Sequence, residues 1–193
     1  MARPATRQRV PSRLMTAEEF FELDIPDAKA ELVRGRVVRM SLPKVWHAVI
    51  AMRIGARLLG FVEAHGLGYV CAETGCITAR DPDTVRGPDV AFVSFERMAG
   101  QVAPDTFLQF APDLAVEVIS PSQRPKQIRE KVQDWFAGGA RRVWLFYPRT
   151  CNVYVLRSPT DVQILGPGDT LTGEDLLPGF SCPVAAFFEP PGR

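Results

Sequence analysis

A single carboxylate interrupts one of the most apolar segments of the chain. Residues 115–119 are Ala-Val-Glu-Val-Ile, a run suited to the interior of a β-sheet, with Glu117 at its centre. An isolated charge in that setting is costly or is forced to take up a proton. Glu117 therefore needs a cation, a metal ion or hydrogen-bond donors beside it, unless its strand lies at a sheet edge where that face meets water.

A second carboxylate, Asp89, begins another apolar strand. It follows Arg-Gly-Pro at 86–88, and Pro88 favours extended backbone and interrupts the ladder of amide hydrogen bonds at that point. Asp89 is a candidate to lie beside Glu117 on a neighbouring strand. The alternative is a turn residue whose side chain caps nearby amides.

The third candidate is Lys131, on a helix predicted from Pro125 to the glycines at 138–139. At 100° per residue, Lys131 lies about 40° from Trp135 on the helical wheel and so borders the buried face. A lysine at this border can lay its stem along the core and bring its ammonium to the sheet carboxylates. Gln127, four residues earlier, projects from the same flank. The apolar stripe consists of Ile128, Val132, Trp135 and Phe136.

Two acids and a lysine make a site for a hard metal ion and a phosphate. Carboxylate oxygens suit Mg²⁺, with Mn²⁺ as a substitute, and an ammonium offsets charge that develops on a phosphoryl group. The predicted reaction is metal-assisted hydrolysis of a phosphodiester. Each of these residues equally suits an ordinary ion pair, and spacing alone does not bring them together.

The elements that must position these residues are readable along the chain. A capping box of Thr16 and Glu19 predicts a short helix, and two apolar runs around Arg34-Gly35 predict a strand, a turn and a strand over 30–40. We predict one α/β (or α+β) domain, a central mixed β-sheet flanked by helices. A long helix is predicted over 47–65, and core strands over 69–78, 89–95, 113–119, 142–147 and 153–156.

Composition narrows the class of protein. The 193 residues are 46% hydrophobic and 23% charged, as in one globular domain, and the net charge of +1 requires any polyanion site to be a local patch. Residues 1–15 carry arginines and prolines without acids, so we expect a flexible basic arm before a domain over 16–193.

The remaining composition bears on location and partners. No apolar run approaches the length of about 18 residues that a membrane span needs, and no signal peptide precedes the domain, so we expect a cytoplasmic protein without a membrane partner. The cysteines lack the paired spacing of a zinc site, and we interpret them as reduced core residues. They are Cys71, Cys76, Cys151 and Cys182.

Several segments carry a resemblance to a known family. The chain resembles the Uma-two family of restriction-endonuclease-like proteins, which belongs to the PD-(D/E)XK nuclease superfamily. The resemblance covers roughly residues 15 to 188. The segments that carry it are Glu-Leu-Val-Arg-Gly from Glu31, His47 after a proline-containing loop, Arg-Gly-Pro-Asp-Val at 86–90, Glu-Val-Ile-Ser-Pro-Ser at 117–122, Lys131, Gly139, Trp144-Leu145 and Leu-Pro-Gly-Phe at 177–180.

The resemblance implies a restriction-endonuclease-like fold, a Mg²⁺-dependent nuclease site and often a homodimer. It assigns Asp89 and Glu117 as metal ligands and Lys131 as the active-site lysine. The usual superfamily lysine lies two residues after the acid, where this chain has Ile119; in the resembled family the following helix supplies it.

The resemblance also adds auxiliary residues. It places Glu31 near the same site as a further catalytic acid that would bind the metal directly or through water, although a hairpin charge paired with Arg34 or Arg36 explains Glu31 as well. His47 is a candidate proton carrier, or it simply caps or packs at the helix start. Gln127 stands where the family commonly has an aspartate, so we expect weaker metal binding or weaker positioning of the lysine.

We therefore expect a Mg²⁺-dependent DNA endonuclease whose partner is DNA. A basic neighbourhood for backbone phosphates is available at Arg124, Lys126, Arg129, Arg141 and Arg142, which equally suit solvated surface charge. The competing hypothesis is a non-catalytic module that keeps the nuclease fold to bind nucleic acid or a protein. A third is a structural subunit of an oligomer, with Trp135, Trp144 and Phe188 at an interface.

Overall fold

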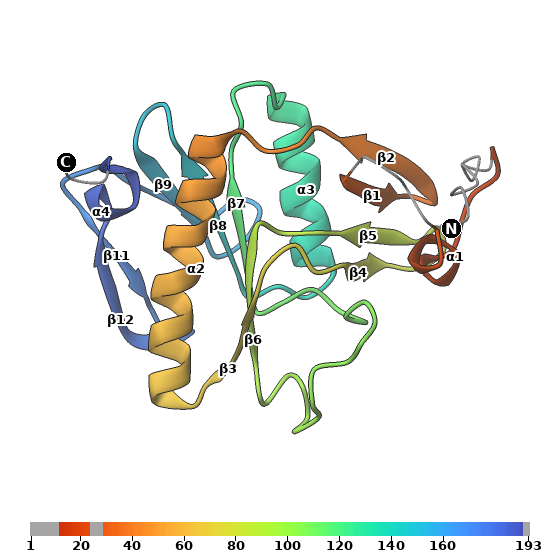
Figure 1. Cartoon of the computed structure of the whole chain (residues 1–193), viewed down its shortest axis with the longest axis horizontal. Coiled ribbons are helices and arrows are strands. Elements are labelled where there is room, and N and C mark those ends of the chain that lie inside the picture. The colour runs from red at the N-terminus through yellow and green to blue at the C-terminus, as the bar shows by residue number, and fades with distance from the viewer. Residues whose placement is uncertain (1–11, 24–28, 191–193) are drawn as a thin grey trace, which may run out of the picture.

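The computed structural model describes residues 12–23 and 29–190, and its centre is a six-stranded sheet (Figure 1). The strand order is β10-β9-β8-β7-β6-β3, and β7 and β8 are parallel while the other neighbours are antiparallel. The predicted central mixed sheet flanked by helices is confirmed. The strands are β3 (Gly68–Cys71), β6 (Val90–Ser94), β7 (Leu114–Val118), β8 (Arg142–Tyr147), β9 (Asn152–Leu156) and β10 (Val162–Leu165).

Side chains alternate between the two faces of the central sheet. Along β7, Val116 and Val118 join the core under α2 (Val45–His65), whereas Ala115 joins the core under α3 (Pro125–Ala137). The period of two places Glu117 on the α3 face with Ala115. The helix α3 is the crossover between the parallel strands β7 and β8, so it must pack on that face.

The helix α2 covers the opposite face together with the C-terminal hairpin β11–β12 (Thr170–Gly173, Leu177–Pro183) and α4 (Ala185–Phe188). A buried row four residues apart faces the sheet, and Gly66 ends the helix in the left-handed conformation at φ 60°. The row consists of Ile50, Ile54, Leu58 and Val62.

The sequence analysis expected no segment long and apolar enough to span a membrane, and α2 does not fit that expectation. By length and composition alone, α2 is long and apolar enough to span a membrane. An 18-residue stretch of it has a mean hydropathy of 1.4, and 22% of that stretch is buried. Four residues of α2 form the buried row against the sheet.

A second sheet of four antiparallel strands, in the order β2-β1-β5-β4, lies beside the central one (Figure 1). The predicted hairpin is confirmed: β1 (Lys29–Val33) and β2 (Arg36–Met40) are joined by Arg34 and Gly35, with φ of 48° and 72°, the signs of a type I′ turn. The remaining strands are β4 (Cys76–Ala79) and β5 (Thr84–Arg86), and α3 packs against both of them and against β8.

The predicted strand over 69–78 is wrong as a single element. The chain turns at residues 72–75, where Glu73 has a φ of 55°, so β3 belongs to the central sheet and β4 to the four-stranded sheet. Strand β5 escaped prediction because three residues show no periodicity, and no strand was predicted where β10 to β12 lie. This change of sheet positions Arg86 opposite Glu31.

At the N-terminus, the capping box is confirmed: the Glu19 amide donates to Thr16 Oγ1 at 3.2 Å before α1 (Ala17–Phe21). Residues 1–11 of the predicted arm lie outside the described residues. Within its described part, Arg13 pairs with Glu19 at 2.6 Å and Met15 packs in the core.

Three large aromatic residues and the cysteines complete the core. Trp135, Trp144 and Phe188 are buried within the chain, so the interior explains them without an interface. All four cysteines are free thiols; Cys76 and Cys182 are buried, and the other two are half-buried.

Candidate active site

The two sheet carboxylates lie on neighbouring strands, as their sequence context predicts. Asp89 directly precedes β6, and Val90 of that strand is the register partner of Val116. The Asp89 amide donates to the Val116 carbonyl at 3.0 Å, and the Val118 amide donates to Asp89 Oδ2 at 2.7 Å. The Asp89 side chain is therefore fixed against the strand that carries Glu117.

Lys131 contacts two buried carboxylates, those of Glu117 and Glu31, and the three residues form a buried cluster. Its Nζ lies 2.8 Å from Glu117 Oε2 and 3.0 Å from Glu31 Oε1, and it donates to the Gly87 carbonyl at 3.2 Å. Only 8% of Lys131 and 4% of Glu117 are exposed. The structure thus brings the predicted lysine and its carboxylates together, while their catalytic roles stay a prediction.

Glu31, on β1, does not pair with Arg34 or Arg36. Its Oε2 accepts from the Arg86 guanidinium at 2.7 Å, and its Oε1 accepts from the Gly87 amide at 3.2 Å as well as facing Lys131. The hairpin pairing considered for Glu31 is wrong because its side chain points to the buried side of the sheet.

His47 lies in the cluster and Gln127 does not. In the first turn of α2, His47 Nε2 is 3.2 Å from Asp89 Oδ2 and 3.2 Å from the Val118 carbonyl. Gln127 is exposed, and its side-chain oxygen accepts from the Arg124 amide at 3.0 Å. An N-terminal capping contact on α3 is the role the structure shows for Gln127.

The sequence analysis missed three residues that complete the cluster. Trp135 Nε1 donates to Glu117 Oε1 at 2.9 Å, and Arg86 Nε donates to Asp134 Oδ2 at 2.9 Å. The signal for Trp135 was its position four residues after Lys131, on the same helical flank. The signal for Arg86 was its place in the segment that contains Asp89.

Burial shapes the ionisation of the cluster. Desolvation raises the pKa of Glu117 to about 7, against the opposing effect of the Lys131 charge and with a further rise from Asp89 and Glu31. For Lys131, desolvation would lower the pKa, but the Glu117 and Glu31 carboxylates outweigh it and raise the pKa. Lys131 is therefore a cation, and burial favours the protonated form of Glu117.

The charge balance of the cluster and its neighbours is also negative. Its ion pairs join five carboxylates to three permanent cations. The carboxylates are Glu31, Glu73, Asp89, Glu117 and Asp134, and the cations are Lys29, Arg86 and Lys131.

These residues fit a hard divalent cation in chemistry and charge. Asp89, Glu117 and the Val118 carbonyl offer oxygen donors at one end of the strands, the type that Mg²⁺ prefers. Among residues 12–23 and 29–190, no group of three or more His, Cys, Asp or Glu side chains is arranged as a metal site.

Comparisons with known proteins agree with this fold. The family described as "Uma2: Putative restriction endonuclease" matches residues 17–185. A crystal structure of "a putative nuclease belonging to DUF820" from Anabaena variabilis ATCC 29413 is similar at a TM-score of 0.77 and 18% identity, over 90% of this chain and 97% of that chain. No curated protein matches the chain.

Proposed function

The chain belongs to the Uma2 family, described as "Putative restriction endonuclease", and from that membership we propose that it is a divalent-metal-dependent DNA endonuclease. One observation carries the proposal: Lys131 Nζ lies within 3.0 Å of carboxylate oxygens from two different sheets, beside the strand end that holds Asp89. Two acids and a lysine at one strand end are the groups that phosphodiester hydrolysis needs.

Asp89 and Glu117 would hold Mg²⁺ or Mn²⁺. When bound, such an ion polarises the phosphate and lowers the pKa of a water molecule. The chain's own contribution is positional: the Val118 amide holds the Asp89 carboxylate and the Trp135 indole holds the Glu117 carboxylate, so neither has to be ordered when the substrate arrives.

Lys131 supplies the positive charge for the phosphate oxygens. Its ammonium is held in place by Glu117, Glu31 and the Gly87 carbonyl, so its positive charge does not have to change position when the phosphate binds. Glu31 and Arg86 act as positioning residues that keep this lysine in place. His47 contacts Asp89 and is suitably placed to fix that carboxylate or to accept a proton.

Cleavage of plasmid DNA tests the proposal. With Mg²⁺ or Mn²⁺ we expect nicked or linear product from the wild type, and at least a hundredfold loss of rate in Asp89→Ala, Glu117→Gln and Lys131→Ala. Glu130→Gln is the matched control, because Glu130 is an acid on the same helix whose contact with the exposed Lys126 spans 3.9 Å. Wild-type rates in all three site variants would reject the assignment.

A non-catalytic nucleic-acid-binding module is the second candidate. It is favoured by the closed pairing of Lys131 with Glu117 and Glu31, since buried ion pairs also serve structure alone. Calorimetric titration with Mn²⁺ separates the two: heat of binding in the wild type but not in Asp89→Ala supports the enzyme. DNA binding without Mn²⁺ binding supports the module.

We further propose a homodimer that pairs the exposed face of α2. Val45, Met52 and Leu59 are 82%, 73% and 40% exposed and repeat every seven residues, with Ala48 and Ala56 between them. Apolar residues that recur every seven positions form the contact line along which two helices pair in a coiled coil. Sedimentation equilibrium should show a dimer that Met52→Glu dissociates, and a wild-type monomer would refute it.

The thiols support a cytoplasmic location, which we also propose. All four cysteines are free, the state that a reducing compartment maintains. Cell fractionation with antibody detection tests this.

A further inference from the structure

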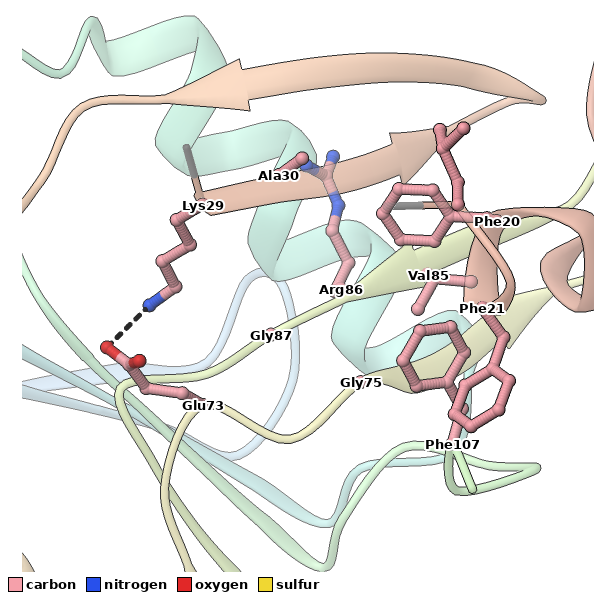
Figure 2. A pocket seen from close by; sticks show the side chains of 11 residues that line it. Phe20, Phe21, Lys29, Ala30, Glu73, Gly75, Val85, Arg86, Gly87 and Phe107 are labelled. Carbon is pink, nitrogen blue, oxygen red and sulfur yellow. Dashed lines mark hydrogen bonds and ion pairs between the residues drawn. The ribbon is translucent and has the colours of Figure 1, made fainter. Parts of the chain in front are cut away.

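An aromatic pocket of about 290 Å³ opens beside the candidate active site (Figure 2). Its lining comes from α1, β1, the turn before β4, β5 and Phe107. Figure 2 shows phenylalanine rings at one end and charged side chains at the other. The lining of this aromatic pocket includes Phe20, Phe21, Phe107, Lys29, Glu73 and Gly87.

The aromatic end presents rings to open space. Phe21 is 44% exposed and meets Phe107 edge to face, with ring centroids 5.0 Å apart at 88°. Phe20 lies behind them, 5.9 Å from Phe107. A Cβ at Gly75 would come within 2.2 Å of the Phe107 ring, so the absence of a side chain at Gly75 lets this ring lie against the backbone. The rings form a stacking platform that protein atoms only partly cover.

The polar end shares its wall with the active site. The carbonyl of Gly87, a lining residue, accepts the hydrogen bond from Lys131. Lys29 Nζ lies 3.1 Å from Glu73 Oε1 and 3.8 Å from Asp89 Oδ1. One ammonium therefore lies between the pocket and a proposed metal ligand.

We propose that the aromatic pocket binds a nucleobase turned out of the stack, next to the phosphate that the active site hydrolyses; this inference rests on the proposed endonuclease function. A base joined to a phosphodiester matches the two ends of the pocket, since the planar ring stacks on phenylalanines and the phosphate lies near Lys29. The volume is at the small end of ligand pockets, which suits one base.

Recognition in this pocket works by stacking. The guanidinium of Arg86, which also lines the pocket, is already committed to Glu31 and Asp134 and offers no free fork to a base edge. Stacking on aromatic rings tolerates every base because each has a π face. The pocket therefore selects nucleotides that are unpaired or unstacked, and it does not select a particular base sequence.

Fluorescence of a single-stranded oligonucleotide containing 2-aminopurine tests the pocket, because this base reports its own stacking. A matched strand carries an abasic residue at that position, and because it lacks the fluorescent base, the affinity of both strands is measured from the anisotropy of a dye at the strand end. We expect Phe21→Ala and Phe107→Ala to weaken binding of the 2-aminopurine strand about tenfold and to leave the abasic strand unaffected, since one stacked base contributes about that factor.

Phe95→Ala is the control variant. Phe95 is 43% exposed and meets Tyr69 edge to face at 5.2 Å and 86°, a pair with nearly the geometry of Phe21 and Phe107 but outside the pocket lining. It should bind both strands as the wild type does. Because 44% of Phe21 is exposed, Phe21→Ala should remain folded, and it decides the test if Phe107→Ala does not fold.

The outcomes separate this inference from the proposed function. If the wild type binds and cleaves DNA while Phe21→Ala behaves as Phe95→Ala does, the pocket assignment is overturned and the endonuclease stands. Equal weakening of both strands by Phe21→Ala also overturns the pocket, because the contact would not involve the base. A wild type that neither binds nor cleaves DNA overturns both.

Discussion

Replacing Glu31 with glutamine tests the buried network that holds Lys131. The substitution keeps the shape of the side chain but removes the negative charge between Arg86 and Lys131, whose contacts with it measure 2.7 Å and 3.0 Å. Each cation keeps another carboxylate, Asp134 or Glu117, so neither becomes isolated.

The expected loss follows from those contacts. A hydrogen bond to a charged group contributes about 1.5–3 kcal/mol. The neutral glutamine has one oxygen, so it can accept from either Arg86 or Lys131 but cannot replace both charged contacts. We therefore expect the free energy of unfolding to fall by about 3 kcal/mol. For a chain of this length that corresponds to a fall in Tm of about 6–12 °C. Calorimetry or circular dichroism at pH 7 measures it.

The control is Glu130→Gln on the surface of α3, where Glu130 Oε1 lies 3.9 Å from the exposed Lys126 Nζ. We expect less than about 0.5 kcal/mol there, because exposed pairs of this kind contribute little. A Tm change for Glu31→Gln no larger than that of the control would refute the reasoning, because Arg86 and Lys131 would then not depend on Glu31.

Three further predictions concern other parts of the molecule. Gly138→Ala should destabilise by about 1–3 kcal/mol in urea unfolding, because its Cβ would lie 2.8 Å from the Thr78 Cα, whereas Gly60→Ala meets nothing within 4 Å and should stabilise by about 0.5–1 kcal/mol; equal effects would contradict this. Burial alone would raise the pKa of Glu174, but its two arginine partners lower it below 4.5, so its stabilisation is present above that pH and is lost as pH falls through the lowered pKa. The cost of Glu174→Gln, about 1 kcal/mol at neutral pH, should therefore disappear in acid, and a pH-independent difference would argue against the ion pairs. Burial raises the pKa of Cys71 to about 11, so its alkylation by iodoacetamide at pH 8, followed by mass spectrometry, should be about 100-fold slower than in urea, and equal rates would exclude the shift.

Local signals in the sequence were sufficient for most of the secondary structure. The Thr16–Glu19 capping box, the turn at Arg34-Gly35 and the left-handed end of α2 at Gly66 depend on contacts within a few residues, and all are present. The strand over 69–78 failed because Glu73, Thr74 and Gly75 interrupt its apolar residues, and the chain changes sheet at that break.

The candidate site divides in the same way. Position on the wheel of α3 placed Lys131 at the edge of its buried face, and the apolar run around Glu117 required a partner for that charge. Both residues were therefore candidates for one site, but only the fold shows that they meet. The roles of Arg86 and Trp135 were not predicted. An arginine in a three-residue strand resembles a surface residue, and a tryptophan in an apolar stripe resembles an ordinary core residue.

The sequence by itself therefore determined which buried charged side chains require a partner, since the cost of burying a charge follows from its neighbours along the chain. Only the tertiary structure decided which partners they have. Glu31 lies 100 residues before Lys131, and it meets that lysine because α3 packs between two sheets whose strand order no local pattern specifies. Contacts across such separations arise from the packing of whole elements, and short-range propensity carries no record of it.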